Sequence, residues 1–158
     1  MSAPELELAM KAAGIGAVAG LRSLTAPALV SADAVWRGAA APSSFTWLTS
    51  TRVCAGLCLL ALGEVIVDKL PMAPDRTIPP SVIFRAFTGG LVGAHQYASN
   101  RRPAAYGAVI GAVAAVAATY GALALRRRAD SATGAPDPLV GLAEDVLAVG
   151  GGLGLLAM

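Results

Sequence analysis

The chain has 158 residues, of which 56% are hydrophobic and only 14% are charged, and its net charge is +2. An average soluble domain carries roughly 25% charged residues, so this composition and a mean hydropathy of +0.64 indicate an integral membrane protein. The basic residues form short clusters between apolar segments rather than one basic face, which argues against a nucleic-acid partner. Cys54 and Cys58 lack the spacing of a redox or metal motif, so we expect no metal site and no cofactor.

The first apolar segment runs from about residue 5 to residue 36, which is too long for one upright crossing at roughly 20 residues per span. It must tilt, break or re-enter. Arg22 lies in its middle, and Pro27 removes a backbone donor five residues later. We therefore expect a broken or kinked helix between about Arg22 and Ser31. The alternative is a tilted helix whose Arg22 reaches the membrane surface. A polar loop should follow over residues 37–52.

The second predicted span covers about residues 53–70. Its last turn carries three ionisable residues, which are Glu64, Asp68 and Lys69. The two carboxylates share one helix face because they are four residues apart. The loop over residues 71–80 contains four prolines, so we expect it to be stiff and to fix the positions of Asp75 and Arg76.

Three further spans are predicted, at about residues 81–98, 104–125 and 138–158. Arg85 lies near the start of the first of these, and Glu144 and Asp145 lie near the start of the last. The chain is thus predicted to be one all-α domain over residues 1–158, a polytopic membrane helix bundle of about five transmembrane helices. Basic residues are slightly more numerous on the side that would hold the N-terminus, which favours a cytoplasmic N-terminus.

Two patterns bear on how these helices pack. Small residues four apart let helix backbones approach closely and could also hold a homo-oligomer together. They occur at Gly16 and Gly20, Gly89 and Gly93, Gly107 and Gly111, and Gly150 and Gly154. The second pattern is an internal echo, with Arg22-x-x-Thr25 matching Arg85-x-x-Thr88. It indicates an internal duplication, unless the match arises by chance in a chain so rich in a few apolar residues.

Ionisable residues inside a membrane are costly, and they mark functional sites or structural ion pairs. Our leading hypothesis is a small transporter or channel-like protein of the inner membrane. Its charged site would bind a small solute or an ion through Arg22, Glu64, Asp68, Arg85 and Glu144. The glutamates would take up a proton or a cation, while the arginines would hold an anionic group or compete for the carboxylates.

Two other functions stay open. A membrane enzyme or lipid-binding protein would have Asp68, Lys69, Asp75 and Arg76 at the membrane interface, with the basic side chains on a lipid phosphate and an acid as the base. No pair of nucleophile and base identifies catalytic residues for it. A structural component of a membrane complex would use the charges only for mutual pairing. The lipid bilayer is the partner that all three hypotheses share.

Three stretches of the sequence are distinctive: GIGAVAGLRSLTAPALVS near the start, LGEVIVDKLPMAPDRTIPPSVIFRAFTGGLVGA in the middle and DPLVGLAEDVLAVGGG near the end. Together they resemble the bacterial membrane-protein family known as domain of unknown function 4126. The resemblance covers nearly the whole chain. It implies a small multi-helix integral protein of the bacterial inner membrane and carries no activity with it.

Overall fold

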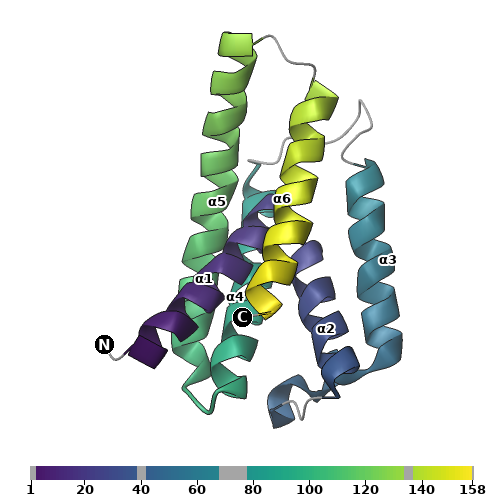
Figure 1. Cartoon of the computed structure of the whole chain (residues 1–158), viewed down its shortest axis with the longest axis vertical. Helices are drawn as coiled ribbons and strands as arrows, with labels where there is room; N and C mark the ends of the chain where they lie inside the picture. The colour runs from purple at the N-terminus through teal and green to yellow at the C-terminus, as the bar shows by residue number, and fades with distance from the viewer. Residues whose placement is uncertain (1–2, 39–41, 68–77, 134–136, 158) are drawn as a thin grey trace.

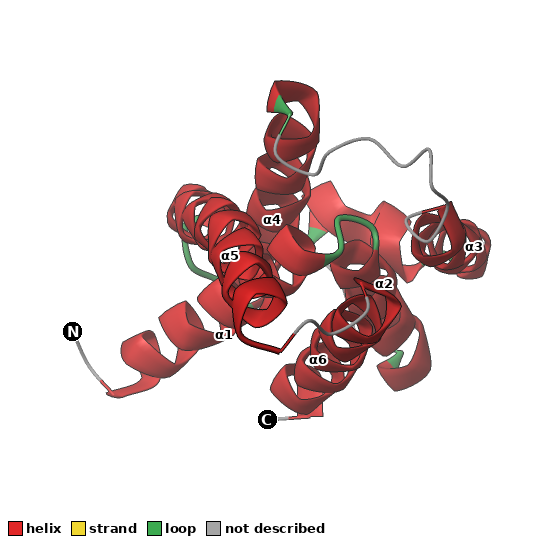
Figure 2. Cartoon of the chain, turned by 90° about the horizontal axis from the view of Figure 1, so that it is seen from above, coloured by secondary structure: helices red, strands yellow, loops and turns green. Residues whose placement is uncertain are grey.

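The computed structural model describes the backbone of residues 3–38, 42–67, 78–133 and 137–157, and every regular element within these ranges is helical (Figures 1 and 2). In chain order the elements are α1 (Ala3–Leu21), α2 (Thr25–Arg37), the 3-10 helix η1 (Ser43–Thr49), α3 (Thr51–Val67), α4 (Pro79–Ser99), α5 (Ala104–Thr133) and α6 (Asp137–Ala157). The all-α prediction is confirmed, and α3 to α6 lie where the second to fifth spans were expected.

The predicted break in the first segment is also confirmed. α1 ends at Leu21 and α2 begins at Thr25, so three residues separate the two helices. Pro27 lies in the first turn of α2, where its missing N–H group would lack an intrahelical partner in any case. Gly38 ends α2 with a φ of 58°, a left-handed conformation that glycine adopts without steric cost.

The two halves form a hairpin, so of the alternatives considered for residues 5–36 the structure shows a break with a reversal of direction. Figure 1 shows α1 running from one end of the bundle into its middle and α2 running back towards the same end. Glu5 at the start of α1 forms an ion pair of 3.2 Å with Arg102, in the turn between α4 and α5. Arg37 at the end of α2 donates to the main-chain oxygen of Leu156, near the end of α6, over 2.7 Å. The start of α1 and the end of α2, called the feet of the hairpin below, therefore both contact the same end of the bundle.

Glycines let α1, α4 and α5 pack with their backbones in direct contact. A Cβ atom on Gly16 of α1 would lie 2.5 Å from the main-chain oxygen of Gly111 in α5, and a Cβ on Gly89 of α4 would lie 2.7 Å from the same oxygen. Three of the four predicted small-residue pairs lie at such contacts, as expected for helices that associate through close packing. The fourth pair lies on an open face of α6, where an added Cβ would meet nothing within 4 Å at Gly150 and Gly154.

The internal duplication is not supported by the surroundings of the two Arg-x-x-Thr elements. Arg22 lies in the break between α1 and α2. Arg85 lies inside the continuous helix α4, where the Thr88 hydroxyl donates to the main-chain oxygen of Arg85 over 3.1 Å. The similarity of the two stretches therefore does not extend to an equivalent place in the fold.

Among the described residues, α5 is the helix long and apolar enough to span a membrane, over Ala104–Arg128. η1 and α3 satisfy the same length and hydropathy condition only when taken together, although they are bent by 68° relative to each other. One helix thus indicates membrane association, and five spans are not confirmed.

Candidate functional site

The ionisable side chains of the bundle converge on the break between α1 and α2. A helix end leaves backbone carbonyl or N–H groups without intrahelical partners, and these need other partners when they are buried. At the end of α1, Nη1 of Arg85 donates to the main-chain oxygens of Gly20 and Leu21, over 2.5 and 3.1 Å. The Thr119 hydroxyl of α5 also donates to the Gly20 oxygen, over 3.0 Å. A cation at this place complements the negative end of the α1 helix dipole.

The start of α2 is held by a carboxylate from α3. Oε1 of Glu64 accepts hydrogen bonds from the Ser23 main-chain nitrogen over 2.9 Å and from the Ser23 hydroxyl over 2.5 Å. Oε2 accepts one from the Leu24 nitrogen over 2.8 Å. The negative charge lies against the positive end of the α2 dipole, so Glu64 acts as a helix cap supplied by another helix.

Two ion pairs involving α6 lie beside the break. Arg22, between the two helices, contacts Asp145 through Nε at 2.6 Å and Nη2 at 2.5 Å. One residue earlier in α6, Glu144 contacts Arg126 of α5 at 3.1 Å. Each of α3, α4, α5 and α6 thus sends at least one charged side chain towards the hairpin or the pairs next to it.

Arg22 and Arg85 lie deeper than the carboxylates nearest to them. Arg22 is 1% exposed and Arg85 is 4% exposed, whereas the Asp145 side chain is 12% exposed and Glu64 is half-buried. In the Arg126–Glu144 pair the carboxylate is the deeper partner, with 11% of its side chain exposed against 26%. Glu64 is therefore the carboxylate at the hairpin tip that water reaches most readily. A buried guanidinium with its partners in place is a fixed charge, while a half-buried carboxylate can exchange a proton or a ligand.

The structure brings together part of the predicted site. Arg22, Glu64 and Arg85 surround the break, and Glu144 lies next to the residue that pairs with Arg22. The other predicted contacts lie outside the described residues, namely Asp68, Lys69, Asp75 and Arg76. Asp145, rather than a glutamate, pairs with Arg22, and sequence reasoning left it out of the site.

Sequence reasoning also missed two residues that contact the break, Ser23 and Thr119, and only Ser23 had a signal in the sequence. Ser23 directly follows Arg22 and precedes the first turn of α2, and serine at a helix start is a recognised capping residue. Thr119 lies within an Ala-rich run of α5 and carries no such signal, since only the crossing of α1 over α5 brings it to the Gly20 oxygen.

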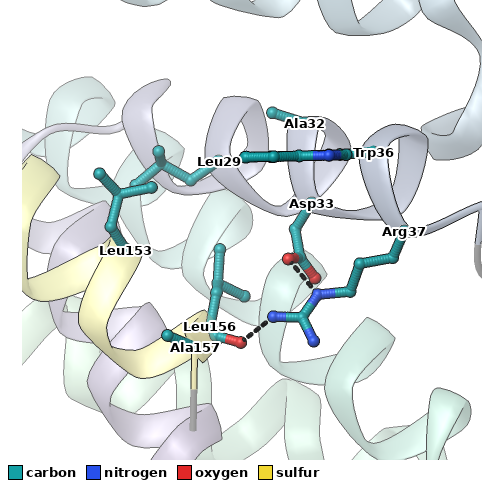
Figure 3. A pocket seen from close by; sticks show the side chains of 8 residues that line it. All are labelled: Leu29, Ala32, Asp33, Trp36, Arg37, Leu153, Leu156 and Ala157. Atoms are coloured by element: carbon teal, nitrogen blue, oxygen red, sulfur yellow. Dashed lines mark hydrogen bonds and ion pairs between the residues drawn. The ribbon is translucent and has the colours of Figure 1, made fainter.

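Two grooves on the described part of the chain lie away from this cluster. One, of about 550 Å³, lies between α2 and the end of α6 (Figure 3). Another, of about 430 Å³, lies between the start of α1 and the turn that joins α4 to α5. Both are at the feet of the hairpin. Neither groove includes a residue of the charged cluster at the tip of the hairpin.

No curated protein and no solved structure matches the chain. One family model matches, described as domain of unknown function (DUF4126), and the match extends over residues 9–158. It begins within α1 and extends through α6, and it includes every residue of the charged cluster. The chain therefore belongs to the DUF4126 family, as its distinctive stretches predicted.

Proposed function

We propose that the chain is a small multi-pass transporter or channel-like protein of the bacterial inner membrane. In this arrangement α3, α4, α5 and α6 cross the bilayer and the α1–α2 hairpin enters it from one side. The observation that carries the proposal is the meeting of two helix ends in the middle of the bundle, each held by a charged side chain from another helix. Discontinuous helices of this kind form the binding sites of many transporters.

The outer surface of the bundle supports the membrane placement. Large apolar side chains are exposed on all four of the proposed spans, with exposed fractions of 70% at Leu59 of α3, 65% at Phe87 of α4, 63% at Val109 of α5 and 64% at Val146 of α6. A soluble monomer rarely exposes apolar surface so widely. Lipid tails would cover these side chains without cost.

The tip of the hairpin supports the proposal of a site. Non-helical backbone at membrane depth is tolerated only where protein buries it or where it lines a water-filled cavity. Here Glu64 holds the start of α2 through charge-assisted hydrogen bonds. Protonation of Glu64 removes the negative charge that these bonds depend on. A neutral carboxyl keeps one carbonyl oxygen as an acceptor, so only part of the donor set of Ser23 and Leu24 becomes available to another anionic group or to water. Proton uptake in this proposal therefore loosens the cluster.

A proton-flux assay tests this proposal. The purified chain is reconstituted into liposomes that contain a pH-sensitive dye, and an inside-negative potential drives protons inward. We expect acidification faster than in empty liposomes. Glu64→Gln should abolish the difference, because glutamine still accepts hydrogen bonds from the start of α2 but cannot exchange a proton. Glu7→Gln, which alters an exposed acid of α1 paired with Lys11, is the matched control and should leave the flux unchanged.

Two outcomes would refute the proposal. One is an unaltered chain that acidifies liposomes no faster than lipid alone. The other is a Glu64→Gln variant that elutes as a folded protein and conducts protons at the unaltered rate. Either result would assign the charged cluster to structural pairing.

A further inference from the structure

The two grooves at the feet of the hairpin share one chemical pattern. The groove between α2 and α6 is walled by apolar side chains, which are Leu29, Ala32, Trp36, Leu153, Leu156 and Ala157, and it also contains Asp33 and Arg37 (Figure 3). The groove beside α1 has an apolar and aromatic wall that includes Tyr97 and Tyr106, together with Glu5 and Arg102. Each groove thus combines an apolar wall with one carboxylate and one guanidinium.

The charged pair of the first groove is accessible to a ligand. Nε of Arg37 contacts Oδ1 of Asp33 at 2.6 Å, and the two side chains are 56% and 31% exposed. Nη2 of Arg37 donates to the Leu156 oxygen over 2.7 Å. These contacts engage two of the five N–H groups of a guanidinium and one of the two carboxylate oxygens. A phosphate can therefore approach Arg37, and an ammonium group can approach Asp33, without the existing pair being broken.

We propose that these grooves bind a zwitterionic phospholipid with a primary ammonium group, such as phosphatidylethanolamine. One acyl chain lies along the apolar wall, the phosphate meets the arginine, and the ammonium meets the carboxylate. The inference rests on the membrane placement in the proposed function, and it does not depend on transport. The groove volume of about 550 Å³ lies within the range of roughly 300–1,000 Å³ typical of ligand sites.

Charge complementarity selects this lipid over the alternatives. The Asp33–Arg37 pair has no net charge, and the phosphatidylethanolamine headgroup has none either. A phosphatidylglycerol headgroup has no cation to place on Asp33, so its phosphate would lie near an unmatched carboxylate. A phosphatidylcholine headgroup has a cation but no N–H donor, so it forms no hydrogen bond with that carboxylate. Trp36, 92% exposed on the groove wall, has the character of a side chain at the level of the headgroups.

Fluorescence quenching by brominated lipids tests the proposal directly. The chain contains two tryptophans, so a Trp47→Phe background leaves Trp36 as the reporter inside the first groove. Lipid-free protein in detergent is titrated with brominated phosphatidylethanolamine or with brominated phosphatidylcholine of the same chain length. We expect half-maximal quenching at about three- to tenfold lower concentration for the ethanolamine lipid, since one charge-assisted hydrogen bond distinguishes them.

Variants then assign the preference to named groups. Asp33→Asn should raise the half-maximal concentration of the ethanolamine lipid to that of the choline lipid, without changing the latter. Arg37→Gln should weaken both lipids because both carry the phosphate. Ala32→Phe should lower the maximal quenching by either lipid, since it fills the groove. Arg127→Gln, at an exposed basic residue near the far end of α5, is the control and should change nothing.

Equal quenching by the two lipids, or a preference that survives Asp33→Asn, would overturn the proposal. So would a dimer in lipid-free detergent that shields Trp36 from both lipids, because the groove would then hold a second copy of the chain. The titration involves no transport. A chain that conducts no protons but shows the ethanolamine preference refutes only the transport proposal, and the reverse result refutes only the lipid groove.

Discussion

The ion pair between Arg22 and Asp145 should be strongly coupled, and its two partners should not be equally costly to remove. At the observed separation of 2.6 Å, two unit charges attract by about 6 kcal/mol for an effective dielectric constant of 20, before the cost of desolvation is subtracted. Removing one partner of a buried pair typically costs about 3–5 kcal/mol, because the other charge is left without compensation. The exposure of each partner decides how fully that cost applies.

Arg22 is the deeper partner. Its side chain is 1% exposed, against 12% for Asp145. Asp145→Asn leaves an arginine that cannot lose its proton in the core, so we expect a loss of about 3–5 kcal/mol in the free energy of unfolding. Arg22→Met leaves the carboxylate of Asp145, which lies nearer the surface, and we expect about half that loss. The double variant should be less destabilised than the sum of the single variants by at least about 2 kcal/mol.

The chain offers a matched control pair. Nε of Arg37 and Oδ1 of Asp33 lie at the same 2.6 Å but are partly exposed, so the corresponding variants Arg37→Met and Asp33→Asn should each cost less than about 1 kcal/mol. Free energies of unfolding are measured by SDS titration in mixed micelles, followed by tryptophan fluorescence. Additive effects within about 0.5 kcal/mol at the buried pair, or a larger loss for Arg22→Met than for Asp145→Asn, would refute this reasoning.

Two further predictions concern packing and topology. Gly16→Ala should lower the free energy of unfolding by more than about 2 kcal/mol in the same titration, because its Cβ would lie 2.5 Å from a main-chain oxygen of α5. Gly150→Ala, on the open face of α6, should be neutral or slightly stabilising. Equal effects of the two substitutions would mean that α1 and α5 are not in backbone contact. If the hairpin re-enters, Ala3→Cys and Ser43→Cys in a background without the native cysteines should react with an impermeant thiol reagent from the same side of the membrane, and Arg127→Cys from the other side. If the first segment crosses the membrane instead, Ala3→Cys should react from the same side as Arg127→Cys.

Much of the fold could be predicted because apolar runs and prolines mark helices by simple physical rules. Pro79 and Pro80 begin α4, as prolines commonly do at the first helical positions. Glycine spacing correctly indicated close helix packing, since only residues without a side chain allow backbones to approach so closely. It did not indicate which helices would meet. The break near Arg22 was likewise indicated by a charged residue and a proline in the middle of an over-long segment.

The reversal of direction at the break could not be predicted from these signals. An apolar run has the same composition whether the chain continues across the bundle or returns. The reversed direction of α2 is held by tertiary contacts. Ser31 in α2 donates to the main-chain oxygen of Leu48 in η1 over 2.6 Å, and Leu48 is fully buried. The stretch that contains η1 resembles a polar loop in sequence, because its two buried apolar residues, Phe45 and Leu48, are separated by the exposed Thr46 and Trp47 and preceded by two exposed serines.

The assignment of charge partners failed for a related physical reason. Matching arginines with acids treats ionisable side chains as partners only of one another, and it places Arg85 opposite a carboxylate. A helix that ends inside a bundle supplies partners of its own, because its last carbonyls and first N–H groups carry partial charges and must be satisfied. Arg85 serves the end of α1 and Glu64 serves the start of α2. The hairpin tip therefore accounts for one positive and one negative charge in a nearly apolar core. The Arg22–Asp145 and Arg126–Glu144 pairs add two contacts between side chains to these backbone contacts.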